Sequence, residues 1–220
     1  MNSFTEENYL KAIYKLMESE GPNVSTNGIA EKMNTKAATV TDMLKKLSAK
    51  KLVNYTKYKG VSLTASGKKI AVCIIRKHRL WEVFLVEKLA FRWNEVHDIA
   101  EQLEHVNSSE LVERLDKFLG HPKNDPHGDP IPDTHGHFAT TPSCLLEAGK
   151  TGVKYHMTGV VDHDSKFLQY LDSLGFSLGC EIRIQSITEY DKSLNITLNK
   201  RKSVYISNEV ARNILICDTH

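Results

Sequence analysis

The sequence lacks several features that mark other classes of protein. It has no apolar run near the roughly 20 residues that a membrane-spanning helix needs. Its first ten residues, MNSFTEENYL, show no charged segment followed by an apolar one, so we expect no secretory signal. The four cysteines are widely spaced without a CxxC pair, which argues against a disulfide framework and a thiolate zinc site. We therefore expect a cytoplasmic protein with no membrane partner.

The charge is unevenly distributed along the 220 residues, although the net charge is only +2. Residues 1–80 hold 15 Lys and Arg against 6 Asp and Glu, whereas residues 81–220 hold 14 against 21. A basic first segment indicates a polyanionic partner such as nucleic acid. On charge alone, a merely basic and soluble domain is the alternative.

The basic segment has the pattern of a winged helix-turn-helix. A helix with a 3.6-residue apolar period, with Thr5 as its N-cap, is followed by a short helix, a tight turn and a longer basic helix. Two short strands with cationic flanks then form a hairpin wing. The expected elements are helices at Thr5–Glu20, Ser25–Met33 and Lys36–Lys51, and strands at Leu52–Lys57 and Val61–Thr64.

Small and hydroxyl residues open the third helix, where a recognition helix would enter the major groove. Ala38 can contact a thymine methyl group, and Thr39 and Thr41 can bond bases or phosphates. Lysines at the helix start and on the wing suit phosphate contacts. A winged helix can instead serve protein interaction. The predicted DNA-binding residues are Lys36, Ala38, Thr39, Thr41, Lys57 and Lys59.

The stretch Arg76–Val106 places histidines and glutamates at helical spacing. His78 and Glu82 are four residues apart on one helix face. On the next helix, positions i, i+4, i+7 and i+8 carry His97, Glu101, Glu104 and His105. Two helices with such stripes can hold a divalent metal between them. A solvated polar face is the alternative.

The middle of the chain is predicted to be helical at Thr64–Arg92, Asn94–His105 and Ser108–Leu119. These helices carry more apolar residues than so small a unit can bury alone, which indicates a dimer interface. The apolar set includes Leu80, Val83, Phe84, Val86, Leu89, Leu111, Leu115, Phe118 and Leu119.

Several segments, taken in order, resemble the diphtheria toxin repressor and manganese transport regulator family of metal-dependent repressors. They are IAEKM, TVTDMLKKL, LTASGKKIA, RKHRLWEVFL, VHDIAEQLEHV and HPKNDPHGDPIP. The resemblance runs from about residue 4 to residue 132 and more loosely to the end. It implies a homodimer that binds Mn(II) or Fe(II) and then an inverted-repeat DNA operator.

The same resemblance implies two metal sites. The primary site would use Glu101, Glu104 and His105, with Asn8 standing where relatives have Met or Asp and Asp125 where some have Cys. Lys11 replaces a Glu of the binuclear manganese-type members, so that arrangement is expected to be lost. Asp125 can instead be a turn-forming Asx-Pro. The second site would use His78, Glu82 and His97, and a C-terminal domain often completes it.

The tail resembles the SH3-like, FeoA-type β-barrel of the longer family members. A connector rich in Pro and Gly precedes it, and its loop histidines, His121, His127, His135 and His137, are expected to be exposed, with a structural role for His127 as the exception. The expected elements are strands VKYHMTGVV, CEIRIQSI, LNITLN and SVYIS, and a helix at Ser165–Leu174. Asp162, His163 and Asp164 precede this helix, either as a reach toward the second metal site or as an N-cap cluster.

The expected fold is mainly α with a small β domain. It divides into a winged-helix DNA-binding domain at 1–72, a helical metal-binding and dimerisation domain at 73–140, and an SH3-like domain at 145–220. A di-metal carboxylate enzyme would need a second Glu-x-x-His pair, which the sequence lacks, as it lacks a nucleophile motif and a phosphate loop. A metal-independent regulator would leave the His and Glu stripes unexplained. We therefore predict a metal-dependent repressor, not an enzyme.

Overall fold

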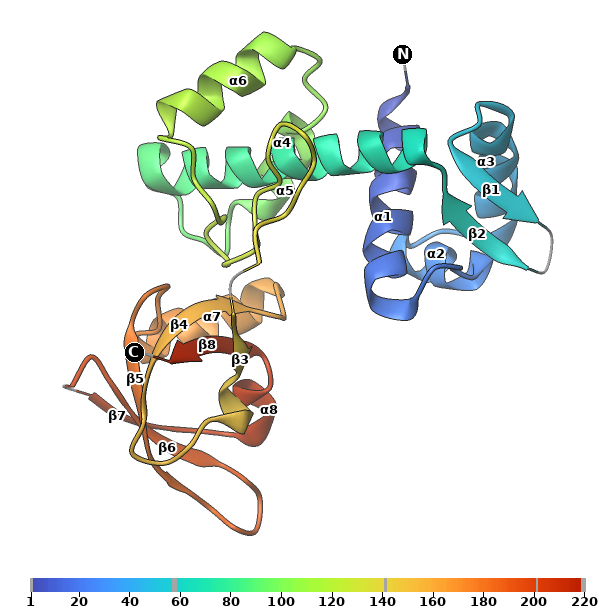
Figure 1. Cartoon of the computed structure of the whole chain (residues 1–220). Helices are drawn as coiled ribbons and strands as arrows, with labels where there is room; N and C mark the ends of the chain where they lie inside the picture. Colours follow the sequence, from blue (N-terminus) through green and yellow to red (C-terminus); the bar gives the residue numbers. More distant parts are fainter. Residues whose placement is uncertain (1, 57–58, 141, 201, 219–220) are drawn as a thin grey trace. The chain divides into compact units, whose positions relative to one another are not determined.

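The computed structural model describes residues 2–56, 59–140, 142–200 and 202–218 (Figure 1). The chain forms two compact units. Unit 1 comprises Met1–His78, Glu101–Glu110 and Pro132–His137, and unit 2 comprises Arg79–Ala100, Leu111–Ile131 and Phe138–His220. In the part of the chain that is described, no helix has the length and apolarity needed to cross a membrane.

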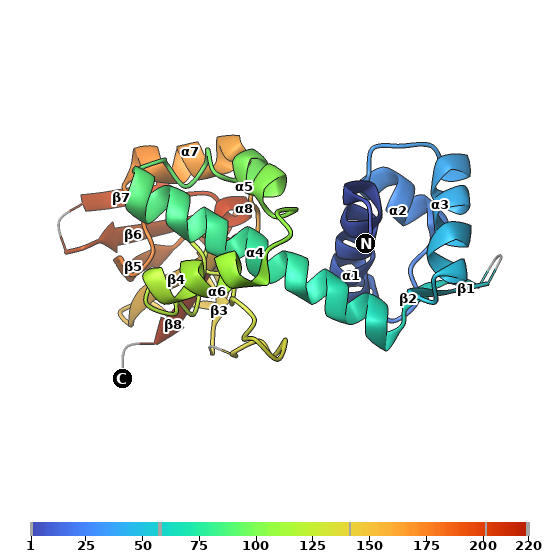
Figure 2. The same cartoon turned by 90° about the horizontal axis from the view of Figure 1, so that it is seen from above.

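Unit 1 contains the winged helix-turn-helix (Figure 2). Its elements are α1 (Phe4–Glu20), α2 (Thr26–Lys32), α3 (Ala37–Ala49), β1 (Val53–Thr56) and β2 (Gly60–Leu63). The strands pair antiparallel in register Val53↔Leu63 to Thr56↔Gly60, and β1 packs beside α3. Apolar residues spaced three and four apart bury one face of each helix, which forms the core of the unit. Fully buried members include Leu10, Ile13, Ile29, Val40, Leu44 and Leu47.

Helix α1 begins earlier than the sequence pattern suggested. Its N-cap is Ser3 rather than Thr5, because Ser3 and Glu6 form a reciprocal capping box. The Ser3 side chain accepts the Glu6 N–H at 3.3 Å, and Glu6 Oε2 accepts the Ser3 N–H at 3.0 Å. For α2, the expected cap Ser25 is confirmed. The earlier start brings Phe4 into α1, and its ring contacts the candidate site described below.

Three further helices follow: α4 (Ala65–Leu89), α5 (His97–Leu103) and α6 (Ser109–Phe118). The helix expected at Asn94–His105 is shorter at both ends in the structure. Helix α5 ends at Leu103, so Glu104 and His105 lie in the turn that follows it rather than on its last face. Within unit 2, α4 and α6 share an apolar cluster that consists of Leu80, Val83, Leu115 and Ile131.

The tail of unit 2 is a six-stranded antiparallel sheet in the order β3-β8-β4-β5-β6-β7. Its elements are β3 (Cys144–Leu145), η1 (Leu146–Ala148), β4 (Lys154–Val160), α7 (Ser165–Leu174), β5 (Glu181–Ile187), β6 (Leu194–Leu198), β7 (Lys202–Ile206), α8 (Asn208–Ala211) and β8 (Ile214–Asp218). Alternate residues of the strands and the apolar face of α7 fill one core. Strands β3 and β8 and helix α8 were not predicted, although β8 lies between β3 and β4 in the sheet.

Candidate metal centres and nucleic-acid interface

The first group of interest lies in unit 1 and is called here the inner cluster. It consists of Glu101, Glu104 and His105, at the end of α5 and in the turn after it, with the α1 residues that contact them. Glu104 is fully buried, and His105 is 7% exposed. A buried carboxylate needs charged or hydrogen-bonding partners to remain ionised. Helix α1 supplies several of those partners.

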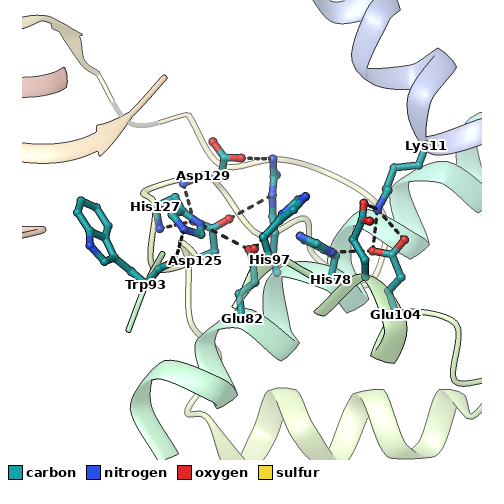
Figure 3. Close-up of polar contacts among 11 residues, drawn as sticks. Lys11, His78, Glu82, Trp93, His97, Glu104, Asp125, His127 and Asp129 are labelled. Carbon is teal, nitrogen blue, oxygen red and sulfur yellow. Dashed lines mark hydrogen bonds and ion pairs between the residues drawn. The ribbon is translucent and has the colours of Figure 1, made fainter. Parts of the chain in front are cut away.

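Lys11 is the cation at the centre of the inner cluster. Its Nζ donates to Glu104 Oε1 at 2.6 Å, to Glu104 Oε2 at 2.8 Å and to Glu101 Oε1 at 3.1 Å (Figure 3). The second oxygen of Glu104 also accepts a 2.6 Å hydrogen bond from His78 Nδ1. Burial raises the pKa of Glu104, but the hydrogen bonds and charges of His78 and Lys11 lower it below its ordinary value overall. Glu104 is therefore an ionised carboxylate whose oxygens are directed at cations.

Glu7 holds the imidazole of the inner cluster in place and was missed by the sequence analysis. His105 Nδ1 donates to Glu7 Oε2 at 2.7 Å, and the Phe4 ring stacks on the imidazole with centroids 4.7 Å apart. The Nδ1 proton is thereby fixed toward Glu7, and Nε2, which lies 3.8 Å from Glu104 Oε1, is the ring nitrogen that faces the carboxylate. The available signal was the spacing of Phe4, Glu7 and Lys11 on one face of α1.

Asn8 follows Glu7 on α1, and its Oδ1 is buried without a hydrogen-bond partner among the described residues. A buried carbonyl oxygen of this kind normally has a partner, so the atom fits a role toward a ligand. His78 was assigned by sequence to the second site. In the structure His78, Glu82 and His97 each offer one ligand atom within 4.8 Å of the others, and His78 Nδ1 also bonds Glu104 of the inner cluster.

A second group, the outer cluster, lies in unit 2 and consists of Glu82, Asp125 and His127. All three are buried, and each offers one ligand atom within 4.8 Å of the others. His97, also expected in the second site, lies on the other side of Glu82, with its Nδ1 3.5 Å from Glu82 Oε1. Asp125 thus groups with Glu82 and His127, whereas the sequence analysis had considered it for the primary site.

His127 presents one ring nitrogen to the outer cluster without a hydrogen bond. Its Nε2 donates to the Trp93 carbonyl at 2.8 Å, while its buried Nδ1 has no hydrogen-bond partner in the described chain and lies 3.7 Å from Glu82 Oε2 (Figure 3). Burial lowers the pKa of His127, but the Glu82 and Asp125 carboxylates raise it to about 9. A neutral His127 would place a lone pair on Nδ1, which is the chemistry of a metal ligand.

Asp125 combines a turn role with a place in the outer cluster. Its Oδ1 accepts the N–H of His127 at 2.8 Å and of Asp129 at 3.0 Å, which is the Asx-turn pattern that the sequence left open. Its Oδ2 lies 3.6 Å from Arg79 Nε. Burial and the neighbouring carboxylates of Glu82 and Asp129 raise the pKa of Asp125 to about 7. Backbone hydrogen bonds therefore hold Asp125 in the outer cluster, although the carboxylates of Glu82 and Asp129 lie nearby.

The tail domain contacts the outer cluster through His163 and through a close backbone approach. The His163 ring stacks on His127 with centroids 4.9 Å apart, and the Val160 N–H donates to the His127 carbonyl at 2.9 Å. At Gly128, with φ +93°, an added Cβ would lie 2.1 Å from the Thr158 carbonyl oxygen. Asp162 accepts the N–H of Asp164, which in turn caps α7. The capping interpretation of these two aspartates therefore has direct support.

The residues predicted to contact DNA are largely exposed in unit 1. Lys36 is the N-cap of α3 but makes no side-chain capping hydrogen bond, and Ala38 and Thr39 are exposed in the first turn. The Thr41 hydroxyl donates to the Ala37 carbonyl at 2.9 Å. On the wing Lys59 is exposed, whereas Lys57 lies outside the described residues. The start of α3 thus presents backbone N–H groups and a lysine to solvent, which suits a phosphate.

Three family models match the chain in succession. Residues 2–61 match the iron dependent repressor N-terminal DNA binding domain. Residues 64–133 match the iron dependent repressor metal binding and dimerisation domain, and residues 144–217 match the FeoA domain. The three ranges follow the DNA-binding, helical and SH3-like order of the sequence analysis.

Individual relatives agree with these matches. The chain is 37% identical over 128 residues to the iron-dependent repressor IdeR of Mycobacterium tuberculosis, and the match spans 58% of this chain but only 55% of that repressor's length. It is 31% identical over 219 residues to the diphtheria toxin repressor of Corynebacterium diphtheriae, with 96% of each chain covered. A solved manganese-dependent transcriptional repressor in complex with manganese is 35% identical, with a TM-score of 0.84 and 97% and 100% of the two chains covered.

Proposed function

Because the chain belongs to the iron-dependent repressor family, which includes the diphtheria toxin repressor, we propose that it is a metal-dependent DNA-binding transcriptional repressor. The family is one of transcriptional repressors, not of enzymes. The proposed co-repressor is Mn(II) or Fe(II), and the proposed role is control of metal-ion homeostasis. A DNA operator as partner also supports a cytoplasmic location.

One observation carries the metal dependence: the first helix of the DNA-binding domain contacts the inner cluster. Glu7 and Lys11 of α1 bond His105 and Glu104, so the charge at the cluster bears directly on how α1 is held. The residues that would hold the ion are Glu101, Glu104, His105 and Asn8. Oxygen ligands with one imidazole suit Mn(II) and Fe(II), which lack the preference of later metals for sulfur. A bound divalent ion would supply positive charge to the two carboxylates.

The outer cluster is proposed as a second metal centre, with Glu82, Asp125, His127 and His97 as its residues. The unpartnered Nδ1 of buried His127 and the excess of acid around it support this assignment. The His163 ring of the tail domain stacks on His127, and His163 with the preceding Asp162 is proposed to complete this centre. His78 is proposed for this second centre together with Glu82 and His97, and its Nδ1 also bonds Glu104 of the inner cluster.

DNA binding is proposed to use the start of α3 in the major groove and the β1–β2 wing on the backbone. Lys36, Lys57 and Lys59 would contact phosphates, while Ala38, Thr39 and Thr41 would face bases. We propose a homodimer on an inverted-repeat operator. Exposed apolar side chains of the dimerisation domain support this, since Leu89 is 53% exposed and Phe118 is 63% exposed.

The test is selection of DNA from a random-sequence duplex pool, followed by affinity measurement on the selected site. We expect enrichment of an inverted repeat and tight binding with Mn(II) or Fe(II), and loss of both in chelator, because an ion that binds one conformation shifts the population toward it. Equal affinity in chelator and in Mn(II) would favour the metal-independent regulator instead.

The DNA surface is tested separately by the salt dependence of that affinity. Lys36→Ala should lower the slope of log K against log salt by about one unit, since each phosphate contact releases about one counterion. The exposed Lys166 of α7 provides the matched control, Lys166→Ala, which should leave the slope unchanged. An unaltered slope in Lys36→Ala would argue against this placement of α3.

A further inference from the structure

We propose that Lys11 is a built-in competitor cation: its ammonium group occupies the carboxylates of the inner cluster, and a divalent ion must displace it to bind. This inference rests on the proposed function, because it concerns the same cluster. It assigns to Lys11 the role of setting how much free metal the protein needs.

Lys11 already provides what a cation provides at this place. Its Nζ is bonded to both oxygens of Glu104 and to one oxygen of Glu101, at 2.6, 2.8 and 3.1 Å (Figure 3). It is 7% exposed, so the ammonium group is removed from water together with the carboxylate that it neutralises. With the His78 hydrogen bond included, three donated bonds satisfy Glu104 without any ion.

An ammonium group and a divalent ion compete for the negative charge of these oxygens. A metal ligand must offer its lone pairs to the ion, and those of Glu104 are directed at Lys11 and His78. Two cations on one buried carboxylate would also repel each other strongly, because screening by water is weak there. Binding therefore requires that Lys11 withdraw its Nζ from Glu104.

The displaced side chain belongs to α1, which gives the competition a structural consequence. Lys11 lies one turn after Glu7, the residue that holds His105 at 2.7 Å, so ion pairing and imidazole positioning act on the same helix face. Removing the ammonium group takes away the ion pair between α1 and the inner cluster, while the Glu7 and Phe4 contacts with His105 remain. When the ammonium group occupies the inner cluster, α1 is therefore joined to it by an ion pair. When a metal ion occupies the cluster, this ion pair is absent.

The competition predicts that loss of the lysine charge tightens metal binding. In an Asp125→Asn background, which disables the outer cluster, Mn(II) affinity is measured by calorimetry with and without Lys11→Met. Methionine keeps the length and apolar stem of lysine but not its charge, and Lys11→Leu, which has no thioether to ligate the ion, should tighten binding in the same way. We expect the dissociation constant to fall at least about tenfold, because the ion no longer competes with an ammonium group. Lys32→Met, at an exposed lysine of α2, should leave it unchanged.

Thermal unfolding supplies a second measurement that does not depend on DNA. Without metal, Lys11→Met should unfold at a lower temperature than the Asp125→Asn parent protein, because Glu104 loses two hydrogen bonds from a cation. The rise in unfolding temperature produced by saturating Mn(II) should be larger in Lys11→Met than in the parent. Lys11→Arg, which keeps the charge, should bind Mn(II) no more tightly than the parent. If Lys11→Met folds poorly without metal, its recovery by Mn(II) supports the proposal.

Two failures are distinguishable. Binding of Mn(II) to the parent and to Lys11→Met with equal affinity, or weaker binding to Lys11→Met, would overturn the role of Lys11 alone. Failure of both proteins to bind Mn(II) would overturn the inner metal centre itself.

Discussion

The inner and outer clusters contain the same kinds of side chain but differ in how their charge is balanced. In the inner cluster Lys11 and His78 donate to Glu104, and the pKa of that carboxyl is lowered. In the outer cluster Arg79 Nε lies 3.6 Å from Asp125 Oδ2, and the Arg79 Nη2 donates to Asp129 at 2.7 Å. The pKa of Asp125 is raised to about 7. One cluster thus has its buried glutamate bonded by a lysine ammonium group, and the other combines an aspartate and a histidine whose pKa values are both raised.

This difference indicates two kinds of exchange on metal binding. At the inner cluster an ion would replace a lysine ammonium group that belongs to the DNA-binding helix, so occupancy is linked to α1. At the outer cluster an ion would replace protons and stabilise the contact between the 125–131 turn and β4 of the tail domain. The first exchange suits control of DNA binding, and the second suits stabilisation of the fold.

Glu104→Gln should produce the largest effect and separates the clusters. The amide leaves Lys11 without its main counter-charge and removes a ligand, so Mn(II) affinity at the inner cluster should fall by about 100-fold or more, roughly 3 kcal/mol. Metal-dependent operator binding should be lost with it. Glu113→Gln, at an exposed glutamate of α6, is the control. An equal loss of operator binding in Glu82→Gln would show that the two clusters do not act separately.

Gly128→Ala should disturb the outer cluster by a purely steric route. The positive φ and the 2.1 Å approach to the Thr158 carbonyl leave no room for a methyl group, so the change should lower the free energy of unfolding by about 2 kcal/mol. Gly120→Ala is a matched control, since Gly120 has φ +75° but nothing within 4 Å of an added Cβ. Denaturant unfolding should show a larger loss for Gly128, and Mn(II) binding to the outer cluster should weaken. Equal losses in the two variants would argue against this docking contact.

Glu7→Gln should weaken the inner cluster more mildly. The amide can still accept from His105 Nδ1, but the charge that orients and polarises the imidazole is gone, which typically reduces metal affinity by about tenfold or more. Glu18→Gln, at an exposed glutamate of the same helix, provides the comparison. Calorimetry with Mn(II) in the Asp125→Asn background measures both. An effect of Glu7→Gln no greater than that of Glu18→Gln would remove Glu7 from the site.

The sequence predicted helices and candidate site residues well where the spacing pattern lies within a single helix. Helical spacing identified α1 to α4 to within a few residues, and the stripe that includes Glu101, Glu104 and His105 pointed to the inner cluster. It overextended α5, because Glu104 and His105 continue the spacing although the helix ends at Leu103. Their positions in the following turn depend on contacts with α1, such as Glu7 to His105, which a local pattern does not contain.

Long-range partners explain what the sequence analysis missed. Glu7 and Lys11 lie more than 90 positions from His105 and Glu104. His127 was named as the exception among the loop histidines, with a structural role, and it is 2% exposed because the turn folds against β4 and Trp93; its place beside Glu82 was not predicted. Strand β8, at the end of the chain, enters the sheet between β3 and β4, an order that periodicity cannot reveal. A single sequence shows which residues share one face of a helix or strand, but it does not show which residues pack against that face.

The smallest expected effect is the release of protons when a metal ion binds, and it should differ between the outer and inner clusters. The pKa of His127 is raised to about 9, and a metal ligand must be neutral imidazole. At pH 8 most of His127 is protonated, so an ion that binds the outer cluster should release close to one proton. Below pH 7 Asp125, with a pKa of about 7, adds a second. Affinity at this cluster should therefore rise with pH up to about 9.

Calorimetry in buffers of different ionisation enthalpy measures this release. The Glu104→Gln variant isolates the outer cluster, and the Asp125→Asn variant isolates the inner one. At the inner cluster the ion would displace an ammonium group rather than a proton, so proton release from this exchange should be far below one. Similar proton release at the two clusters would contradict the difference in charge balance. A release near one at the outer cluster alone would establish that one centre exchanges metal for protons and the other for lysine.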